Sequence, residues 1–561
     1  MKNHYFILLL LLPFLSFAQT WITSGVTPDL SAYGEATNYP GEGEYQIFLS
    51  PDGILDKPII VVDGFDTGDL RDINGIYSLL DFVNSSGTEN LADQLRTQDF
   101  DVIILNFPIY TRAADSETID GGTDFMERNA MLLVELITII NADKSLNSPD
   151  QNVIIGPSMG GLISRYALNY MEANSMDADT RLFISFDAPH LGANVPIGLQ
   201  HQLNYLANNP LSPVAELQPF IESLLKSPAG RQLLIDHFES HLTGDDLFTF
   251  DDNLTLPEPH PFRTTFNTNI NNLTISGFPE NVRNVAIVNG SGTGSSYFAA
   301  DGVTPVTNGF AIVDAILPVD SPLGTIDVEI DIHMTPAAGT PRQVSRFFAP
   351  LLPPFIPDIE NTASAGTVNF DGVDSAPGGL FDLSALTDSF GTGGGIGDAF
   401  FAALQIDKFS YIPTVSALAL DITEPDTGNE INWHYNGDFS SASPFANIYS
   451  PDANEPHVLL TEANVAFALD EILNTPLSIS ETELQSVKLE KNPVKNELIL
   501  RSDLNSKATI LISDLTGKIV QQSSQKLTGR DIISIDLTNG FYILNIINEV
   551  NTFTTRFIVS K

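Results

Sequence analysis

Between residues 57 and 190, short apolar runs alternate with amphipathic segments of helical length. The runs are Pro-Ile-Ile-Val-Val (58–62), Val-Ile-Ile-Leu (102–105), Val-Ile-Ile (153–155) and Leu-Phe-Ile-Ser-Phe (182–186). Such runs are typical of strands buried on both faces. Strands that alternate with helices predict a parallel sheet covered by helices on both faces. In sheets of this kind the reactive groups gather at the carboxyl ends of the strands.

Ser158 lies at the end of one of these predicted strands. Residues 153–166 read Val-Ile-Ile-Gly-Pro-Ser-Met-Gly-Gly-Leu-Ile-Ser-Arg-Tyr, which predicts a strand, a sharp turn with the serine at its apex, and a helix. Such a turn exposes the serine oxygen above the sheet. A Gly-x-Ser-x-Gly pattern also arises by chance in a chain with 40 glycines. The strand before it and the helix after it favour a nucleophile over an ordinary turn serine.

A serine nucleophile needs a base that takes its proton, and histidine is the usual one. The chain has nine histidines. We predict His457, because it follows the serine in the chain and stands in a loop just before a predicted helix at 462–473. The order nucleophile, acid, base is typical of this serine geometry. His190, which we interpret as part of the site rim, and His434 are the alternatives.

The acid that orients the base has three candidates. Asp407 precedes the apolar segment 409–420, which we expect to be a strand close to the base. Asp301 and Asp421 are the rivals, since each lies near a predicted strand in the stretch between the serine and the histidine. We choose Asp407 because it lies between the serine and the histidine in the chain and precedes a segment expected to lie near the histidine.

The negative oxygen formed during serine attack needs hydrogen-bond donors. The backbone N–H of Met159 is one candidate, because it follows the nucleophile at a helix start, where N–H groups lack partners. The second candidate is the N–H of Phe65, in the loop Asp63-Gly64-Phe65-Asp66 that follows the strand at 58–62. The alternative interpretation of that loop is a simple strand-ending turn.

The composition restricts the compartment and the chemistry. An apolar run from Tyr5 to Phe17, followed by Ala18, predicts a secretory signal at 1–18 that is removed. The chain has no cysteine, which excludes disulfides and cysteine-based zinc or redox sites. Its net charge of −44 argues against nucleic acid and anionic membranes as partners. No calcium loop motif is present, and we expect neither a metal nor an organic cofactor.

The chain divides into two predicted domains. The α/β domain spans 19–475, with a helical cap insertion at 195–280 and a β-rich insertion at 291–405. The cap could equally be a plain helical decoration. A polar linker at 476–487 leads to a module at 488–561, whose short strands predict a small all-β sandwich. Charge supports this boundary, because 488–561 holds 10 Lys+Arg and 7 Asp+Glu, whereas the remainder holds 16 and 63.

These residues together resemble the α/β-hydrolase fold. Residues 156–166 and the segment Asp-Ala-Pro-His-Leu-Gly-Ala at 187–193 resemble the lipase-like branch that includes the GPI inositol-deacylases. The segment Ile-Pro-Thr-Val-Ser-Ala-Leu at 412–418 resembles the Val-Pro-x-x-Ser segment of lecithin–cholesterol acyltransferases. In that family the acid precedes the proline by four residues, whereas Asp407 precedes Pro413 by six. The resemblance covers roughly residues 55–475.

The C-terminal module resembles the type A sorting domain of the type IX secretion system of Bacteroidota. The matching segments are 491–494 (Lys-Asn-Pro-Val), 514–520, 537–544 and the terminal Lys561. This resemblance implies export by an N-terminal signal, passage through the type IX machinery, removal of the module, and release or attachment at the cell surface.

The sequence therefore predicts a secreted serine hydrolase of carboxylic esters, similar to lipases and esterases, that works through an acyl-enzyme intermediate. Abundant phenylalanine and the predicted cap favour an ester substrate with an apolar acyl group. Two alternatives remain: an amidase or peptidase on the same scaffold, and a catalytically inactive protein that binds at the cell surface.

Overall fold

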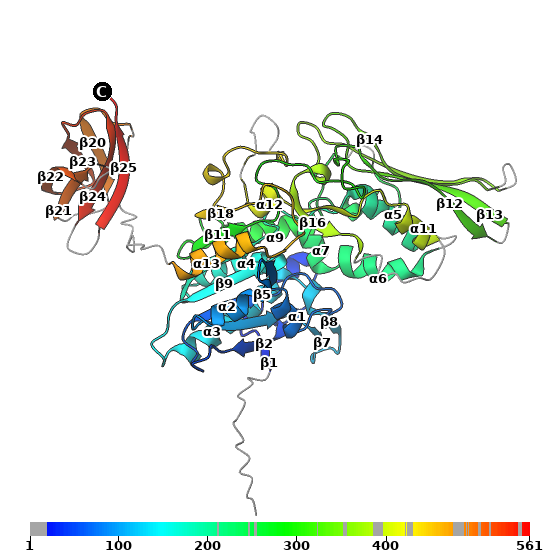
Figure 1. Cartoon of the computed structure of the whole chain (residues 1–561), viewed down its shortest axis with the longest axis horizontal. Helices are drawn as coiled ribbons and strands as arrows, with labels where there is room; N and C mark the ends of the chain where they lie inside the picture. Colours follow the sequence, from blue (N-terminus) through cyan, green and yellow to red (C-terminus); the bar gives the residue numbers. More distant parts are fainter. Residues whose placement is uncertain are drawn as a thin grey trace, which may run out of the picture. The chain divides into compact units, whose positions relative to one another are not determined.

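The computed structural model describes two compact units, Met1–Ile472 and Leu473–Lys561. We call them the main unit and the C-terminal unit (Figure 1). The described residues are 19–209, 213–244, 247–251, 255–321, 324–351, 356–384, 396–420, 422, 430–474, 487–489, 491, 493–502, 507–514, 518–547 and 552–561. The predicted signal at 1–18 lies outside them, as does the predicted linker except for Val487. No helix in these ranges is long and apolar enough to cross a membrane.

An eight-stranded sheet forms the centre of the main unit. Its strands in spatial order are β1 (Thr20–Thr23), β2 (Glu42–Phe48), β6 (Asp101–Asn106), β3 (Pro58–Val62), β9 (Asn152–Pro157), β10 (Thr180–Phe186), β11 (Arg283–Ile287) and β18 (Asn447–Tyr449). β2 is antiparallel to both neighbours. From β6 to β18 all neighbours are parallel. The predicted parallel sheet is confirmed, and β1 and β2 extend it by an antiparallel edge.

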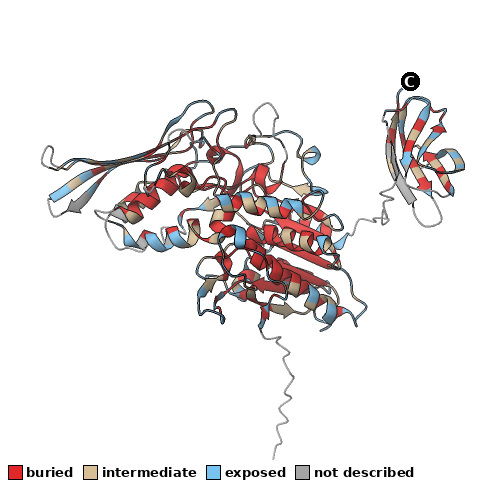
Figure 2. Cartoon of the chain, turned by 180° about the vertical axis from the view of Figure 1, so that it is seen from behind, coloured by how far each residue is buried: buried red, intermediate tan, exposed pale blue. Residues whose placement is uncertain are grey.

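Helices cover both faces of this sheet, because alternate residues of the central strands enter different cores. Ile60 and Ile154 pack with α3 (Met126–Lys144) and α4 (Met159–Ala173). Ile59 and Val153 pack on the other face with α1 (Ile73–Ser78), α2 (Leu91–Arg96) and α13 (Glu462–Leu473). The central strands are accordingly buried throughout (Figure 2). Burial on both faces explains why these strands are continuous apolar runs.

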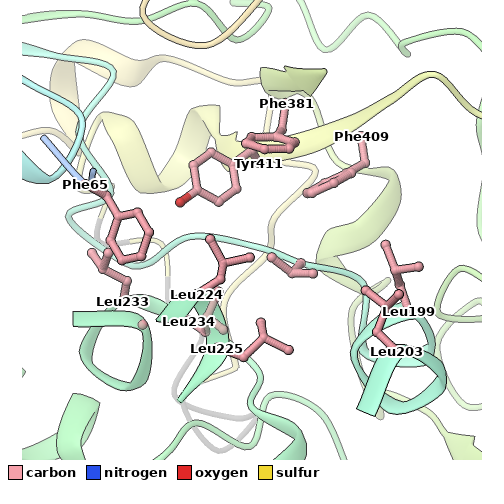
Figure 3. A pocket seen from close by; sticks show the side chains of 12 residues that line it. Phe65, Leu199, Leu203, Leu224, Leu225, Leu233, Leu234, Phe381, Phe409 and Tyr411 are labelled. Carbon is pink, nitrogen blue, oxygen red and sulfur yellow. The ribbon is translucent and has the colours of Figure 1, made fainter. Parts of the chain in front are cut away.

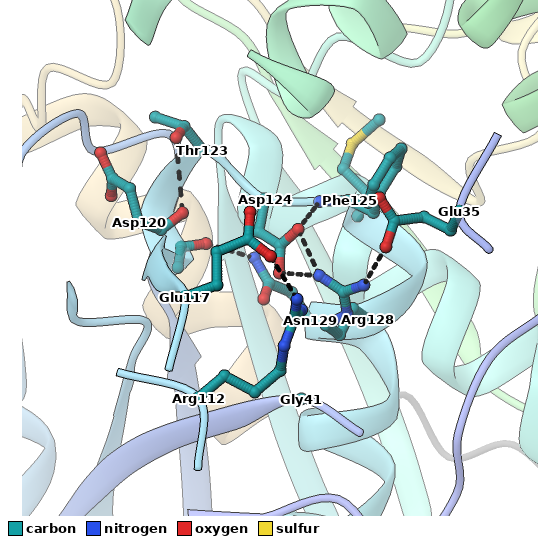
Figure 4. Close-up of polar contacts among 12 residues, drawn as sticks. Glu35, Gly41, Arg112, Glu117, Asp120, Thr123, Asp124, Phe125, Arg128 and Asn129 are labelled. Carbon is teal, nitrogen blue, oxygen red and sulfur yellow. Dashed lines mark hydrogen bonds and ion pairs between the residues drawn. The ribbon is translucent and has the colours of Figure 1, made fainter. Parts of the chain in front are cut away.

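The start of α3 is tied to the N-terminal segment by a buried charge cluster (Figure 4). Arg128 is 2% exposed, and its Nη1 donates to both carboxylate oxygens of Asp124 at 2.7 and 2.6 Å. Its Nη2 lies 3.6 Å from Glu35 Oε2. A buried guanidinium without such partners would be costly, so these carboxylates fix the N-terminal segment against the helix.

A largely helical insertion separates β10 from β11. Its helices are α5 (Ile197–Asn208), η3 (Ala215–Leu217), α6 (Gln218–Phe220), the π-helical turn η4 (Ile221–Leu225), α7 (Pro228–Leu233), α8 (Phe238–His241) and α9 (Pro261–Asn272). A second insertion separates β11 from β18 and contains an antiparallel sheet of β12 (Ala311–Ser321), β13 (Gly324–His333), β14 (Arg342–Ala349) and β15 (Ile359–Ala365).

The second insertion continues with short helices and a pair of strands. They are η5 (Val373–Ser375), β16 (Gly378–Asp382), α11 (Ile396–Ala402), β17 (Lys408–Pro413), α12 (Thr414–Ala417) and η7 (Phe439–Ser441). β16 and β17 pair with each other as a separate two-stranded ribbon. The segment 409–420 was expected to be one strand, but β17 ends at Pro413 and a helical turn follows.

Small elements complete the main unit. They are η1 (Ser31–Tyr33), the hairpin of β4 (Asp81–Asn84) and β5 (Gly87–Asn90), the hairpin of β7 (Ile109–Thr111) and β8 (Thr118–Asp120), and η2 (Gly121–Thr123).

The C-terminal unit is all-β. One sheet has the order β19 (Val487–Leu489), β20 (Glu497–Ser502), β23 (Arg530–Ser534). The other has the order β22 (Ile519–Lys526), β21 (Lys507–Ser513), β24 (Gly540–Ile547), β25 (Thr552–Val559). Residues of both sheets share one apolar core, including Leu500, Ile510 and Leu544. The predicted sandwich is confirmed.

Candidate active site

Ser158 stands at the carboxyl end of β9, in the turn that leads into α4. Its backbone has φ 52° and ψ −131°, a conformation rarely adopted by residues other than glycine. Its N–H donates to the carbonyl of Phe186 on the neighbouring strand at 2.9 Å. A Cβ on Gly160 would lie 2.4 Å from the carbonyl oxygen of Val62, so only glycine permits this approach of helix to sheet. The geometry matches the strained nucleophile turn.

His457 contacts Ser158 from a distant part of the chain. Its Nε2 lies 2.8 Å from Ser158 Oγ. The backbone around it pairs with β16, because His457 N–H donates to the carbonyl of Leu380 at 2.8 Å and Leu380 N–H donates to that of Glu455 at 2.9 Å. The second insertion thus holds the histidine loop. The structure brings together the serine and the histidine that the sequence singled out.

The carboxylate that contacts His457 belongs to Asp187, the first residue after β10. Its Oδ2 lies 2.7 Å from His457 Nδ1, and its Oδ1 accepts the N–H of Asn289 at 3.1 Å. The side chain is fully buried. A Cβ on Gly379 would lie 2.0 Å from Oδ2, so glycine is required there. Since an ionised carboxylate only accepts, Nδ1 carries the ring proton and Nε2 is free to accept from Ser158.

Asp407 was predicted to be the acid that contacts His457, and the structure shows that this prediction is wrong. Its side chain is 54% exposed, and its Oδ2 lies 3.6 Å from Lys408 Nζ. It precedes β17 at the end of the ribbon remote from the histidine loop, because Lys408 pairs with Asp382, whereas the loop binds Leu380. The two-residue departure from the Val-Pro-x-x-Ser pattern had already put this position in question.

The two rival acids do not replace it. Asp301 is exposed, and its Oδ1 accepts the backbone N–H groups of Val303 and Thr304 at 2.9 and 2.8 Å, as in a local turn. Asp421 lies outside the described residues. The sequence held only a partial signal for Asp187, which directly follows the predicted strand at 182–186.

The two rival histidines have other partners. His190 is 3% exposed, its Nε2 lies 2.8 Å from Ser185 Oγ, and its ring contacts Phe278 and Phe445. Burial holds the pKa of His190 well below its usual value. It is therefore a core residue rather than part of a site rim. His434 Nε2 lies 3.1 Å from the carbonyl oxygen of Gly372.

The loop expected to supply an oxyanion donor lies beside the serine. A Cβ on Gly64 would lie 3.2 Å from Ser158 Cβ and 3.7 Å from the backbone nitrogen of Met159. Arg71 Nη2 donates to the carbonyl of Phe65 at 2.8 Å and to Asp63 Oδ1 at 3.2 Å. Burial raises the pKa of Asp63 to about 6, although Arg71 opposes this shift. Arg71 thus fixes the peptide that follows Phe65.

A narrow apolar pocket begins at Phe65 (Figure 3). Phe65 and Leu233 lie at one end of the labelled set, Tyr411 lies near its middle, and Leu199 and Leu203 of α5 lie at the other end. Its twelve lining residues are Phe65, Val195, Leu199, Leu203, Leu224, Leu225, Gly230, Leu233, Leu234, Phe381, Phe409 and Tyr411. The first insertion supplies all six leucines, and the ribbon β16–β17 supplies three of the four aromatic rings. The pocket also adjoins the histidine, because the Tyr411 ring lies 5.2 Å from the His457 ring between centroids.

A metal site is not evident in the described part of the chain, where no three His, Asp or Glu side chains are grouped to hold an ion.

Two segments of the chain match known protein families. Residues 74–209 match the family described as "Putative serine esterase", a range that contains Ser158 and Asp187. Residues 492–560 match the "Secretion system C-terminal sorting domain". The main unit has the α/β-hydrolase fold. Along the chain, its sheet strands occupy spatial positions 1-2-4-3-5-6-7-8, and Ser158 stands at the fifth.

The curated proteins contain no match. Among solved structures, an α/β serine hydrolase without lid from Xanthomonas campestris is 16% identical, covers 31% of this chain and 63% of its own, and has a TM-score of 0.20. A Pyrobaculum calidifontis esterase is 11% identical, with 48% and 75% coverage and a TM-score of 0.23. The peroxisomal alpha-beta-hydrolase Lpx1 of Saccharomyces cerevisiae is 13% identical, with 48% and 73% coverage and a TM-score of 0.26.

Proposed function

We propose that the protein is an exported serine hydrolase that cleaves carboxylic esters with an apolar acyl group. The observation that supports this most strongly is the hydrogen-bonded row Ser158–His457–Asp187, with 2.8 and 2.7 Å between partners. These residues occur in the chain order nucleophile, acid, base. The row adjoins a pocket lined almost wholly by apolar side chains.

In the proposed mechanism, Ser158 Oγ attacks the ester carbonyl carbon while His457 Nε2 takes its proton. Asp187 accepts the Nδ1–H and stabilises the imidazolium that forms. The carbonyl electron pair moves onto oxygen, where the N–H groups of Phe65 and Met159 stabilise the charge. Each such donor contributes roughly 3 kcal/mol. His457 then protonates the leaving alcohol, and water repeats the sequence on the acyl-enzyme.

The pocket is the proposed acyl-binding site. Each methylene group that leaves water for such a pocket contributes about 0.8 kcal/mol. This corresponds to roughly a fourfold gain in kcat/KM per methylene. We therefore expect kcat/KM to rise with acyl length until the chain reaches Leu199 and Leu203.

Export is the proposed context of this activity. The match of 492–560 to a secretion sorting domain indicates release from the cell or display on it through the type IX system. We propose that residues 1–18 are the signal for the first step and that the C-terminal unit is removed after export.

A fluorophosphonate probe tests the enzyme assignment on the full chain. The wild-type protein should be labelled, Ser158→Ala should not, and Ser145→Ala, an exposed serine at the end of α3, should be labelled like wild type. Absence of labelling in wild type, or labelling that survives in Ser158→Ala, would favour the inactive binding protein. His457→Ala should abolish turnover, and undiminished turnover would remove the proposed base.

Matched esters and amides test the bond that is cleaved. p-Nitrophenyl esters and p-nitroanilides that share an acyl group should be compared at several acyl lengths. We expect turnover of the esters and rising kcat/KM with length. Faster turnover of the anilides would mean that the amidase alternative is correct.

A further inference from the structure

Tyr411 places a single hydroxyl in an otherwise apolar pocket. The other eleven lining residues have apolar side chains or none. No hydrogen-bond partner for Tyr411 Oη is found among the described residues, although its backbone carbonyl accepts the N–H of Asn194 at 2.7 Å. Tyr411 is half-buried. In a mostly apolar pocket, a single polar group is the one that can orient a polar atom of a bound ligand.

The backbone around Tyr411 is built irregularly. In the ribbon, Leu380 pairs with Ser410 and Gly379 pairs with Ile412, so Tyr411 has no opposite residue on β16. It is the extra residue of a β-bulge, a feature that redirects side chains and is frequent beside active sites. The same ribbon holds the His457 loop and leaves room for Asp187 at Gly379. The bulge thus belongs to the scaffold of the site.

The hydroxyl is directed toward Phe65, which follows the Gly64 that lies beside Ser158. In Figure 3 the Tyr411 oxygen lies on the side of its ring that faces Phe65. The ring itself stands nearly perpendicular to the His457 ring, at 78° and 5.2 Å between centroids. The hydroxyl therefore lies in the pocket, on the side of Phe65, the residue that carries an expected oxyanion donor.

Burial raises the pKa of Tyr411 to about 12. The group is therefore protonated at neutral pH and is available as a donor.

We propose that Tyr411 Oη donates a hydrogen bond to the carbonyl oxygen of the bound ester and to the oxyanion that this oxygen becomes. This inference rests on the proposed function and adds a side-chain donor to the two backbone N–H groups. Tyr411 forms and breaks no covalent bond. When the Ser158 Oγ–carbon bond forms, the carbonyl π pair moves to the oxygen and the serine proton moves to His457, while the Tyr411 proton stays on Oη.

Tyr411→Phe tests this, because it removes the hydroxyl and keeps the ring against His457. Loss of a hydrogen bond to the charged oxyanion would destabilise the transition state, so we expect kcat to fall by about 10- to 100-fold. KM should stay nearly unchanged, and the loss should be the same for unsubstituted acyl esters of every length. Tyr170→Phe, the same change near the end of α4, should retain wild-type kcat. An alkyl boronic acid, which mimics the tetrahedral state, should bind Tyr411→Phe more weakly by a similar factor.

Three results would overturn the inference. They are an unchanged kcat in Tyr411→Phe, a loss confined to KM, and a loss only with esters whose acyl chain carries a polar substituent. The last would assign the hydroxyl to acyl specificity instead. Thermal unfolding of each variant checks folding. Activity that persists in Ser158→Ala would refute the proposed function itself, whereas an inactive Ser158→Ala beside a fully active Tyr411→Phe would refute only the role of Tyr411.

Discussion

Replacing Asp187 by asparagine should disable the proposed base by reversing the protonation of its ring. The N–H of Asn289 points at Oδ1 from 3.1 Å, so the amide oxygen of an asparagine must take that place. Its NH₂ group then takes the place of Oδ2, 2.7 Å from His457 Nδ1. A donor at this point forces Nδ1 to accept, which moves the ring proton to Nε2. Ser158 would then face an N–H that cannot take its proton.

In the serine-protease template this wrong tautomer lowers kcat by about 10⁴-fold, which corresponds to roughly 5 kcal/mol of transition-state stabilisation. We expect a loss of this size in Asp187→Asn, measured as kcat on a p-nitrophenyl ester, with thermal unfolding near that of wild type. Asp407→Asn and Asp301→Asn are the controls and should stay within about twofold of wild type, because both side chains are exposed. A loss below tenfold in Asp187→Asn, or an equal loss in Asp407→Asn, would refute the reasoning.

Three further changes test other parts of the structure. Gly379→Ala would bring a Cβ to 2.0 Å from Asp187 Oδ2 and should lower kcat by about 100-fold through displacement of the carboxylate; normal kcat would show that the acid has room to move. Leu203→Phe should shorten the pocket and lower kcat/KM for long acyl esters by about fourfold per excluded methylene, while short esters are unaffected; equal losses at all lengths would contradict the acyl-site assignment. Burial raises the pKa of the Asp236 carboxyl to about 7. The folded state therefore holds the carboxyl proton more tightly than the unfolded state does, and the free energy of unfolding decreases as the pH rises through that value. Asp236→Asn should remove up to about 4 kcal/mol of this pH dependence. The variant should then have a higher Tm than wild type at pH 8 but not at pH 4. The reverse order of Tm values would show that Asp236 is ionised in the folded protein.

The central sheet could be predicted because its strands are apolar on both faces. The runs at 58–62, 102–105, 153–155 and 182–186 became β3, β6, β9 and β10, with boundaries shifted by at most two residues. The antiparallel strands β1 and β2 at one side of the sheet were not predicted, since their mixture of polar and apolar residues has no clear period. The prediction of one strand over 409–420 was wrong because an apolar run of that length fits either a strand or a buried helical turn.

The residues of the candidate site were also only partly predictable from the sequence. Local sequence was enough for Ser158, whose turn, glycines and following helix are all encoded within about ten residues. Chain order and a loop before the last helix were enough to single out His457. The acid could not be chosen among many carboxylates, because its role depends on which one meets Nδ1, and that contact joins residues 270 positions apart.

By itself, the sequence determined the α/β class, the position of the serine turn and the separate C-terminal unit, because these depend on short-range pattern and composition. Only the tertiary structure decided which carboxylate contacts the histidine, how β16 holds the histidine loop, and that a bulge turns Tyr411 into an apolar pocket. These features arise where the second insertion packs against the carboxyl ends of β9 and β10. Contacts between segments so distant in sequence leave no periodic signal along the chain.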